Sequence, residues 1–296
     1  MSGADLDSVV ESPPDVQALR REEAEIARRY MGRVPWEMVA WGLGNFALWL
    51  SLWPLALTGV LPLWAAFLLS TLSITVCYLP SHEAQHSIIG AKGSRYRWLN
   101  ELVGHVSTIP LLLPYRIAWI THKQHHLHTN DPQLDPDYGN RGNTWWQSAW
   151  NGIQARQFGA GDGYRNAILR SEDPNLKKAI REGTMLSLTF YTILAVLAWS
   201  GYAIEAVLIW WLPRHLATIY IQLFLSWAPH YPMQEKGRYR DTRAWKSPVG
   251  TTLSMWMEYH IIHHLFPRIP LFQTGPAYWE MRELLKERGC RDDRGG

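Results

Sequence analysis

Cysteine is scarce in this sequence, with two residues among 296. Cys77 lies in an apolar run and Cys290 in a polar tail, so no disulfide framework is indicated. Charged residues make up only 19% of the chain, and the net charge is +3 with the basic residues scattered. Binding to nucleic acid through a basic surface is therefore not expected.

The first residues also lack a basic-then-apolar signal peptide. The segment 1–35 is polar and charged, with arginines on both sides of a glutamate cluster. We expect this N-terminal segment to stay in the cytoplasm, partly disordered, with a helix over residues 15–30.

Charge is missing altogether between Met38 and Ser81. Because the hydrocarbon core of a bilayer is about 30 Å thick and needs roughly 20 apolar residues per helix, this stretch can cross twice. Gly59 and Pro62 supply a break in its middle. The sequence predicts two hairpins of spans: residues 37–57 with 62–81, and residues 184–202 with 206–228.

The last predicted span is interrupted near its middle by Arg214 and His215. Charge inside a membrane is costly and is usually functional. A kinked segment around Pro213 that faces protein is an equally good interpretation, and both stay open.

The two short turns inside these hairpins carry no Lys or Arg, whereas the remaining hydrophilic segments carry nearly all of them. The positive-inside rule therefore places both termini and the long middle segment in the cytoplasm, with a bacterial inner membrane as the expected location. The apolar stretch Val106–Leu113 is too short to span, so we expect it to be interfacial or re-entrant. The expected domains are a membrane domain over 36–288, with a cytoplasmic cap over 82–183 and 230–288, and a tail over 289–296.

Histidine is abundant, with 12 residues, and most of them are grouped. Nine fall on the predicted cytoplasmic side, in three boxes and one isolated position: His82, His86; His122, His125, His126; His230; His260, His263, His264. The other three, His105, His128 and His215, are interpreted as ordinary hydrogen-bonded histidines.

The spacing within each box indicates metal binding, because helical residues three and four apart share a face. Imidazole binds Zn, Cu, Fe and Ni, so residue type alone does not choose the metal. Nine candidates exceed the ligands of one zinc ion and fit two metals. The expected fold is thus an all-α integral membrane protein, with four transmembrane helices in two hairpins and a cytoplasmic helical cap that holds a dimetal site.

Two other classes of protein are compatible with parts of this pattern. His82-Glu83-Ala84-Gln85-His86 matches the zinc-protease motif, with Glu83 as the base, but it leaves the other boxes unexplained. A membrane haem or metal-transport protein is the other alternative. Haem ligation, however, needs paired histidines inside the spans, whereas these cluster beyond the span ends.

The combined boxes resemble the membrane fatty-acid desaturase superfamily over roughly residues 36–285. Within it, the chain is most similar to the bacterial and cyanobacterial β-carotene ring hydroxylase branch. The similar stretches are residues 125–132 (HHLHTNDP), Asp135-Pro136-Asp137, residues 229–235 (PHYPMQE) and residues 259–270 (YHIIHHLFPRIP). One departure is Glu83, where these relatives commonly carry Asp.

The resemblance implies a non-haem centre of two Fe2+ ions held by the nine histidines. It also implies O2 as oxidant and electrons from a separate ferredoxin or cytochrome-type donor, since no donor domain is recognisable in the chain. The implied reaction is C–H activation of a lipophilic substrate, in contact with membrane lipids. Hydroxylation of a carotenoid ring is the first expectation, and a fatty-acyl desaturase or hydroxylase is the alternative.

Acidic residues beside the boxes are candidates for orienting the imidazole rings. Asp131 and Asp137 are preferred over the other candidates, which are Glu83, Asp135, Asp241 and Glu258. For each, a solvated loop or turn residue is the competing interpretation. Apolar residues at helical spacing over 276–288 further predict an amphipathic helix that lies on the membrane or caps the cytoplasmic domain.

Overall fold

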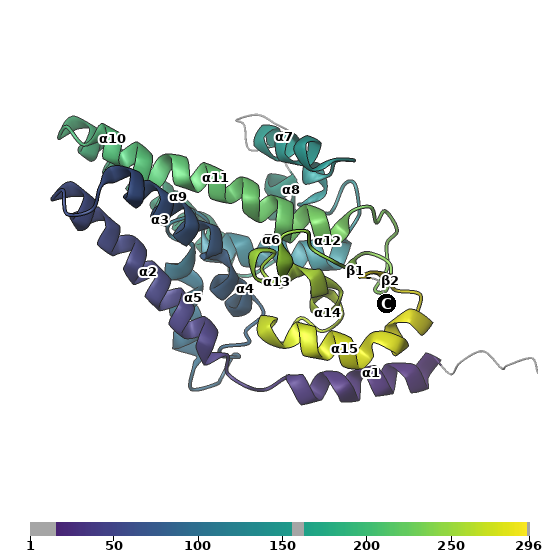
Figure 1. Ribbon diagram of the computed structural model, residues 1–296. Helices are drawn as coiled ribbons and strands as arrows, with labels where there is room; N and C mark the ends of the chain where they lie inside the picture. Colours follow the sequence, from purple (N-terminus) through teal and green to yellow (C-terminus); the bar gives the residue numbers. More distant parts are fainter. Residues whose placement is uncertain (1–15, 156–162, 295–296) are drawn as a thin grey trace, which may run out of the picture.

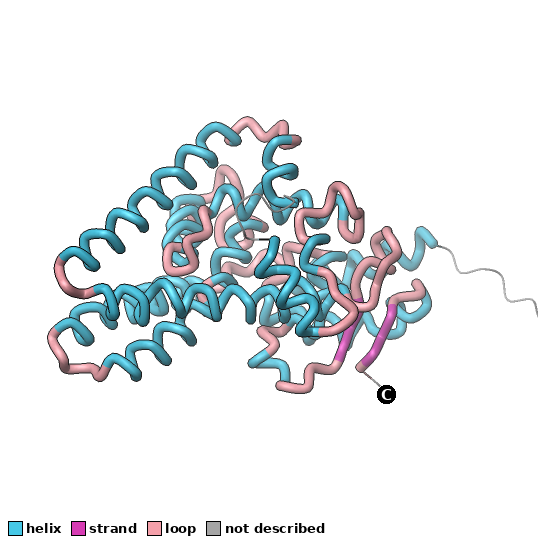
Figure 2. Tube along the Cα trace, turned by 90° about the horizontal axis from the view of Figure 1, so that it is seen from above, coloured by secondary structure: helices cyan, strands magenta, loops and turns pink. Residues whose placement is uncertain are grey.

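The computed structural model describes residues 16–155 and 163–294, and these are predominantly helical (Figure 1). The α-helices are α1 Val16–Tyr30, α2 Trp36–Leu57, α3 Leu63–Val76, α4 Tyr78–Gln85, α5 Arg97–Thr108, α6 Tyr115–His128, α7 Trp145–Ala155, α8 Gly163–Leu169, α9 Leu176–Trp199, α10 Ala203–Ala206, α11 Leu212–Ile221, α12 Ala228–His230, α13 Gly250–Leu253, α14 His260–Leu265 and α15 Leu271–Glu287. Two π-helical segments, η2 Val207–Trp211 and η3 Gln222–Trp227, and two 3-10 turns, η1 Tyr138–Asn140 and η4 Met257–Tyr259, complete the helices. One parallel pair of short strands, β1 Arg243–Trp245 and β2 Arg291–Asp293, departs from the all-α expectation (Figure 2).

Three helices of the described chain are long and apolar enough to cross a membrane, judged by length and composition. They are Trp36–Leu57, Leu63–Gln85 and Leu176–Trp199, which coincide with three of the four predicted spans. The fourth predicted span forms a succession of α10, η2, α11, η3 and α12 instead of one apolar α-helix. Arg214 and His215 reduce its apolar character, and the π-helical segments divide it, so the four-span expectation is met only in part.

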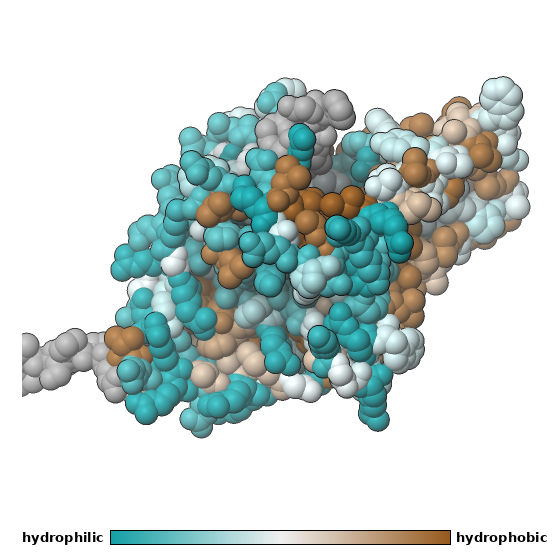
Figure 3. All heavy atoms as spheres, turned by 180° about the vertical axis from the view of Figure 1, so that it is seen from behind, coloured by the Kyte–Doolittle hydropathy of each residue, from teal (hydrophilic) through white to brown (hydrophobic). Residues whose placement is uncertain are grey.

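The helices divide the molecule into a narrow half and a broad half. Helices α2, α3 and α10–α11 extend together along the narrow half and end at the turns near residues 58–62 and 200–203 (Figure 1). On the face shown in Figure 3, hydrophilic residues cover much of the broad half around a central apolar patch, whereas apolar and neutral residues dominate the narrow half. This division is the one expected for a membrane anchor that carries a polar cap.

Aromatic rings join the apolar helices to one another. The ring of Trp210 lies 5.0 Å from that of Trp49 and 4.7 Å from that of Phe190. Its indole N–H donates a hydrogen bond of 2.8 Å to the carbonyl of Pro110. Of the stretch Val106–Leu113, predicted to be interfacial or re-entrant, residues 106–108 end α5, and residues 109–113 form a turn between α5 and α6 that packs against the apolar helices.

The two ends of the described chain meet in the broad half. Helix α1, which confirms the helix predicted over 15–30, packs against α15 through Ile26 and Ala27. The disorder expected at the N-terminus concerns residues outside those described. Helix α15 starts at Leu271, before the predicted 276, and buries Tyr278 and Met281 against α1 and α14. It therefore caps the polar domain, which was one of its two predicted roles.

Helices α4, α5 and α6 are held together at a close approach around Gly104. A Cβ atom at this position would lie 2.5 Å from the ring of Tyr115, whose hydroxyl donates a 2.9 Å hydrogen bond to the carbonyl of Ala84. We expect Gly104→Ala to lower the free energy of unfolding by about 1–3 kcal/mol, because the ring has to move out of a packed site. Thermal or denaturant unfolding in detergent measures this effect.

Gly44→Ala provides the matched control, since a Cβ atom there meets nothing within 4 Å. Gly44 also lies inside a helix, where alanine is the better helix former by roughly 0.5–1 kcal/mol. A Gly104→Ala protein as stable as Gly44→Ala would contradict this account of the packing.

Candidate metal centre

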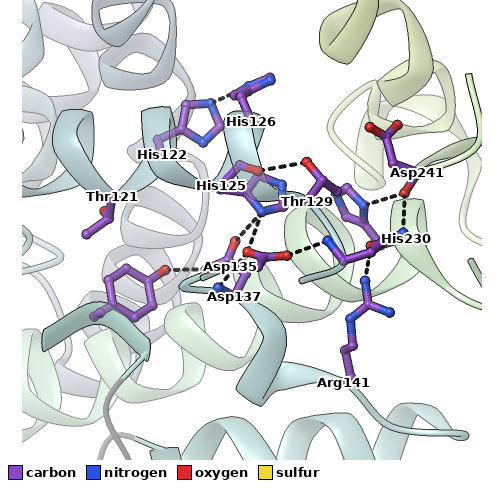
Figure 4. Close-up of polar contacts among 12 residues, drawn as sticks. Thr121, His122, His125, His126, Thr129, Asp135, Asp137, Arg141, His230 and Asp241 are labelled. Atoms are coloured by element: carbon purple, nitrogen blue, oxygen red, sulfur yellow. Dashed lines mark hydrogen bonds and ion pairs between the residues drawn. The ribbon is translucent and has the colours of Figure 1, made fainter. Parts of the chain in front are cut away.

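The nine grouped histidines converge in the broad half of the molecule. Helix α4 and the residue that follows it carry His82 and His86, and α14 carries the last box. Helix α6 carries the middle box, and α12 ends at His230 (Figure 4). The helices bring together residues up to 182 positions apart in sequence, all with ring nitrogens directed toward one region.

Four of these histidines form a first group, in which one ring nitrogen from each lies within 4.8 Å of the others: His82, His86, His122 and His263. The Nε2 atoms of His82 and His263 are 3.1 Å apart. Those of His86 and His122 are 2.9 Å apart. This geometry could hold one metal ion.

A second group of four satisfies the same criterion: His125, His230, His260 and His264. Here the Nε2 atoms of His260 and His264 are 3.1 Å apart. His126 lies between the groups, because its Nε2 is 2.9 Å from that of His263 and its ring is 4.4 Å from that of His264. Two adjacent four-histidine groups and one intermediate ring fit a pair of metal ions.

The environment of most of these rings, with His125 as the exception described below, favours the neutral form that ligates metals. Burial lowers the pKa of His122, His126 and His263 well below the ordinary value, and the neighbouring imidazoles lower it further. The His230 ring donates from Nδ1 to the carbonyl of Asp241 at 3.1 Å, which leaves Nε2 buried with no protein partner among the described residues. A ring fixed through one nitrogen and open at the other is typical of a metal ligand.

Asp135 orients His125 in the second group. His125 Nδ1 donates a 2.8 Å hydrogen bond to the buried carboxylate, which also accepts the backbone N–H groups of Asn130 and Asp137 (Figure 4). Burial alone would lower the pKa of His125, but the charge of Asp135 outweighs this effect and raises that pKa to about 9. The hydrogen bond to Asp135 keeps a proton on Nδ1, so Nε2 is the nitrogen that can face a metal ion, and binding a metal there would displace the second proton that the raised pKa favours.

The two acids preferred from sequence have different surroundings. Asp137 lies 3.9 Å from His125 Nδ1 and accepts a 2.7 Å hydrogen bond from the hydroxyl of Tyr164. Asp131 accepts the N–H groups of the following turn and pairs with Lys236 at the surface, so for this residue the turn interpretation describes the structure. The sequence reasoning gave too little weight to Asp135.

The remaining acidic candidates contact backbone or other side chains. Glu258 accepts hydrogen bonds from the N–H of Ser247 and the hydroxyl of Thr251, and pairs with Arg294. Asp241 contributes its carbonyl oxygen to His230. Both residues therefore support the loops around the histidines.

Glu83 accepts a 2.7 Å hydrogen bond from the N–H of Leu271 at the start of α15. We expect Glu83→Gln to keep its metal content and thermal stability, because the amide oxygen can accept the same bond. Glu83→Ala should cost about 1–3 kcal/mol of stability, since it leaves a buried N–H unpaired. Metal analysis and thermal unfolding measure these effects in both variants. A zinc protease that used Glu83 as its base would instead lose its activity in Glu83→Gln.

The three histidines predicted to lie outside the centre belong to neither group. The ring of His105 packs edge-on against that of Tyr115, and its Nε2 lies 3.9 Å from Glu101. His215 contacts Arg214 and the carbonyl of Trp211. His128 ends α6 beyond the grouped rings.

An apolar cavity of about 350 Å³ opens beside the histidines. Its wall includes His82, His122, His125 and His260, together with leucines of the 111–113 turn and one face of α11 and η3. A more polar cavity of about 380 Å³ lies beyond His125 and His230 and shares Asp137, Asn140 and Ser226 with the first. A long apolar molecule could therefore lie beside both histidine groups.

The chain is similar to known proteins named as acyl-lipid and fatty acid desaturases. The chain is 23% identical over 241 residues, 71% of its length, to an sn-1 oleoyl-lipid 12-desaturase of Synechocystis sp.. It is 24% identical over 85% of its length to a chloroplastic omega-6 fatty acid desaturase of Spinacia oleracea. It is also 33% identical over 61 residues, 21% of its length, to an sn-1 acyl-lipid omega-3 desaturase (ferredoxin) of Nostoc sp..

The aligned region spans 66% of the Synechocystis protein, 59% of the spinach protein and 16% of the Nostoc protein. The family model described as fatty acid desaturase matches residues 58–294, which contain all nine grouped histidines. The chain belongs to the fatty acid desaturase family.

Proposed function

We propose that this protein is an O2-dependent diiron oxidoreductase that introduces a double bond into a fatty acyl chain. The observation that carries the proposal is the pair of four-histidine groups beside an apolar cavity. Family membership and relatives named as lipid desaturases support the same reaction class. They support the acyl-chain alternative better than the first expectation, carotenoid ring hydroxylation.

In this proposal one Fe2+ binds to His82, His86, His122 and His263, and the other to His125, His230, His260 and His264, with His126 between them. Together with O2 and electrons, such a centre supplies the oxidising power to remove hydrogen from an unactivated C–H bond. The role of the chain itself is to position the substrate. The cavity wall excludes water and holds the apolar chain against both groups.

Electrons would come from a separate ferredoxin, as the name of the Nostoc relative indicates for that protein. The lysines and arginines around the histidine-bearing half favour a cytoplasmic position for the centre, according to the positive-inside rule. This orientation allows a soluble donor to reach the metal ions while the substrate comes from the membrane.

A product assay tests the proposed reaction. The chain would be expressed with a ferredoxin and its reductase in a bacterial host that makes β-carotene, and lipids and pigments would be analysed by mass spectrometry. We expect acyl chains that have lost two hydrogens, with carotene unchanged. Carotene that gains oxygen, with unaltered acyl chains, would contradict the proposal, and a host with the empty vector provides the baseline.

A further inference from the structure

A single arginine lies on the wall of the apolar cavity, in the helix that was predicted to be the fourth span. Arg214 shares one face of α11 and η3 with Thr218, Ile221, Gln222 and Ser226, and all five line the cavity. At a rise of about 1.5 Å per residue, the twelve positions from Arg214 to Ser226 cover roughly 18 Å. Arg214 thus lies at the other end of this helical face from Ser226, which lines both cavities together with His125 and Asp137.

Arg214 has no acidic partner within ion-pair distance in the part of the chain that the structure describes. Its Nη2 lies 3.2 Å from Nε2 of His215, whose Nδ1 donates to the carbonyl of Trp211 at 2.6 Å. The guanidinium carbon lies 5.6 Å from the ring centroid of Phe190. Its Nε is buried with no hydrogen-bond acceptor among the described residues.

The neighbouring polar side chains do not supply an anion. The hydroxyl of Thr218 donates to the carbonyl of Arg214 at 2.7 Å, and the amide of Gln222 donates to the carbonyl of Ser148 at 2.6 Å. Asp137, at the opposite end of the cavity, is bonded to Tyr164. The Arg214 guanidinium is therefore a positively charged hydrogen-bond donor at the cavity wall, and no carboxylate pairs with it among the described residues.

An uncompensated cation on the wall of an apolar cavity is costly, and pairing with an anion reduces that cost. A planar guanidinium matches the two oxygens of a carboxylate in particular. An apolar chain that ends in a carboxylate would fill the cavity and supply the missing charge at once.

We propose that Arg214 binds the carboxylate of a free long-chain fatty acid, whose chain runs along α11 and η3 to the histidines. This inference rests on the proposed function, because it assumes that an acyl chain occupies this cavity. It differs from the acyl-lipid substrates that the relatives' names describe, since an esterified chain has no free carboxylate. The distance from Arg214 to the histidines would then determine which part of the chain is oxidised.

The test is equilibrium binding of oleate and of methyl oleate to the purified full-length chain in neutral detergent, at alkaline pH, where oleate is ionised. The two probes share one chain and differ in the charged end. We expect the wild-type chain to bind oleate about ten- to a hundredfold more tightly, the range that a charge-assisted hydrogen bond supplies. Arg214→Leu should lose this preference and keep the affinity for methyl oleate, which also reports that the cavity is intact.

Two further variants test whether the preference for oleate depends on the guanidinium of Arg214 in particular. Arg214→Lys should keep part of the preference, because the charge remains and the two-pronged geometry is lost. Arg181→Leu provides the matched control, because Arg181 is an exposed arginine of α9 that does not line the cavity, and the preference should be unchanged.

Equal binding of the two probes to the wild-type chain would overturn the role of Arg214 and leave acyl-chain binding intact. So would an unaltered preference in Arg214→Leu. If neither probe bound to the wild-type chain, the proposed function itself would be contradicted.

Discussion

Replacement of His263 with alanine is expected to remove iron from the chain and to reduce acyl-chain oxidation below detection. The Nε2 atom of His263 lies 3.1 Å from that of His82 and 2.9 Å from that of His126, so its loss affects the first group and the intermediate ring together. Three ligands would remain in a group of four. Iron per chain, measured by atomic emission, and fatty-acid analysis of the expressing cells give the two readouts.

His128→Ala provides the matched control, because this histidine ends the same α6 helix that bears the middle box and belongs to neither group. It should retain wild-type iron content and product yield. Full iron and activity in His263→Ala would show that the converging nitrogens do not hold the metals. Equal losses in both variants would point to a general effect on folding.

Asp135→Asn should lower metal affinity or activity by about 10–100-fold, the usual effect of removing a carboxylate that orients a ligating histidine. The carboxylate holds the proton of His125 on Nδ1 at 2.8 Å and is itself fixed by two backbone N–H groups. Asparagine has nearly the same shape, so the substitution removes the negative charge and changes which ring nitrogen of His125 carries the proton. Titration with Fe2+ under anaerobic conditions measures the affinity.

Asp131→Asn tests the specificity of that effect, since this acid lies four residues earlier and pairs with Lys236 at the surface. Exposed ion pairs contribute little to stability, so iron affinity should stay within a fewfold of wild type. If Asp131→Asn reduced iron affinity as strongly as Asp135→Asn, the assignment of Asp135 to His125 would be incorrect.

Much of the fold could be predicted from the sequence, because membranes impose simple constraints. The charge-free stretch around Gly59 and Pro62 predicted two spans, and α2 with the helix Leu63–Gln85 has nearly these bounds. The charged helix near residues 15–30 was also predicted from local pattern, and α1 confirms it. The boundaries of the last predicted span were less certain, because Arg214 and Pro213 weaken the apolar signal that defines it.

The grouping of the nine histidines was predictable from their spacing, whereas the acid that orients one of them was not. Asp131, Asp135 and Asp137 lie 5 to 11 positions after His126, the last residue of the middle box, and each could reach a ring. The choice depends on the turn at Asn130, which adopts a left-handed φ of 69° and donates its backbone N–H to Asp135. Such a turn is set by tertiary contacts, including those from Asn130 Nδ2 to the carbonyls of Glu235 and Asp241.

The substrate was the least predictable feature, because the same histidine boxes serve ring hydroxylation and acyl desaturation. The choice between them came from relatives named as lipid desaturases and from the shape of the cavity. In the sequence, Arg214 is notable as a charged residue within a predicted span. Its relation to the cavity depends on how α11 is rotated against α6, which helical periodicity alone does not determine.

The metal content of the wild-type chain tests the central claim most directly. The chain would be purified in detergent, loaded with Fe2+ under anaerobic conditions, freed of excess metal and analysed for iron and zinc. Our account predicts two iron ions per chain, one for each group of four histidines. A single tightly bound zinc ion, with no stoichiometric iron, would contradict it.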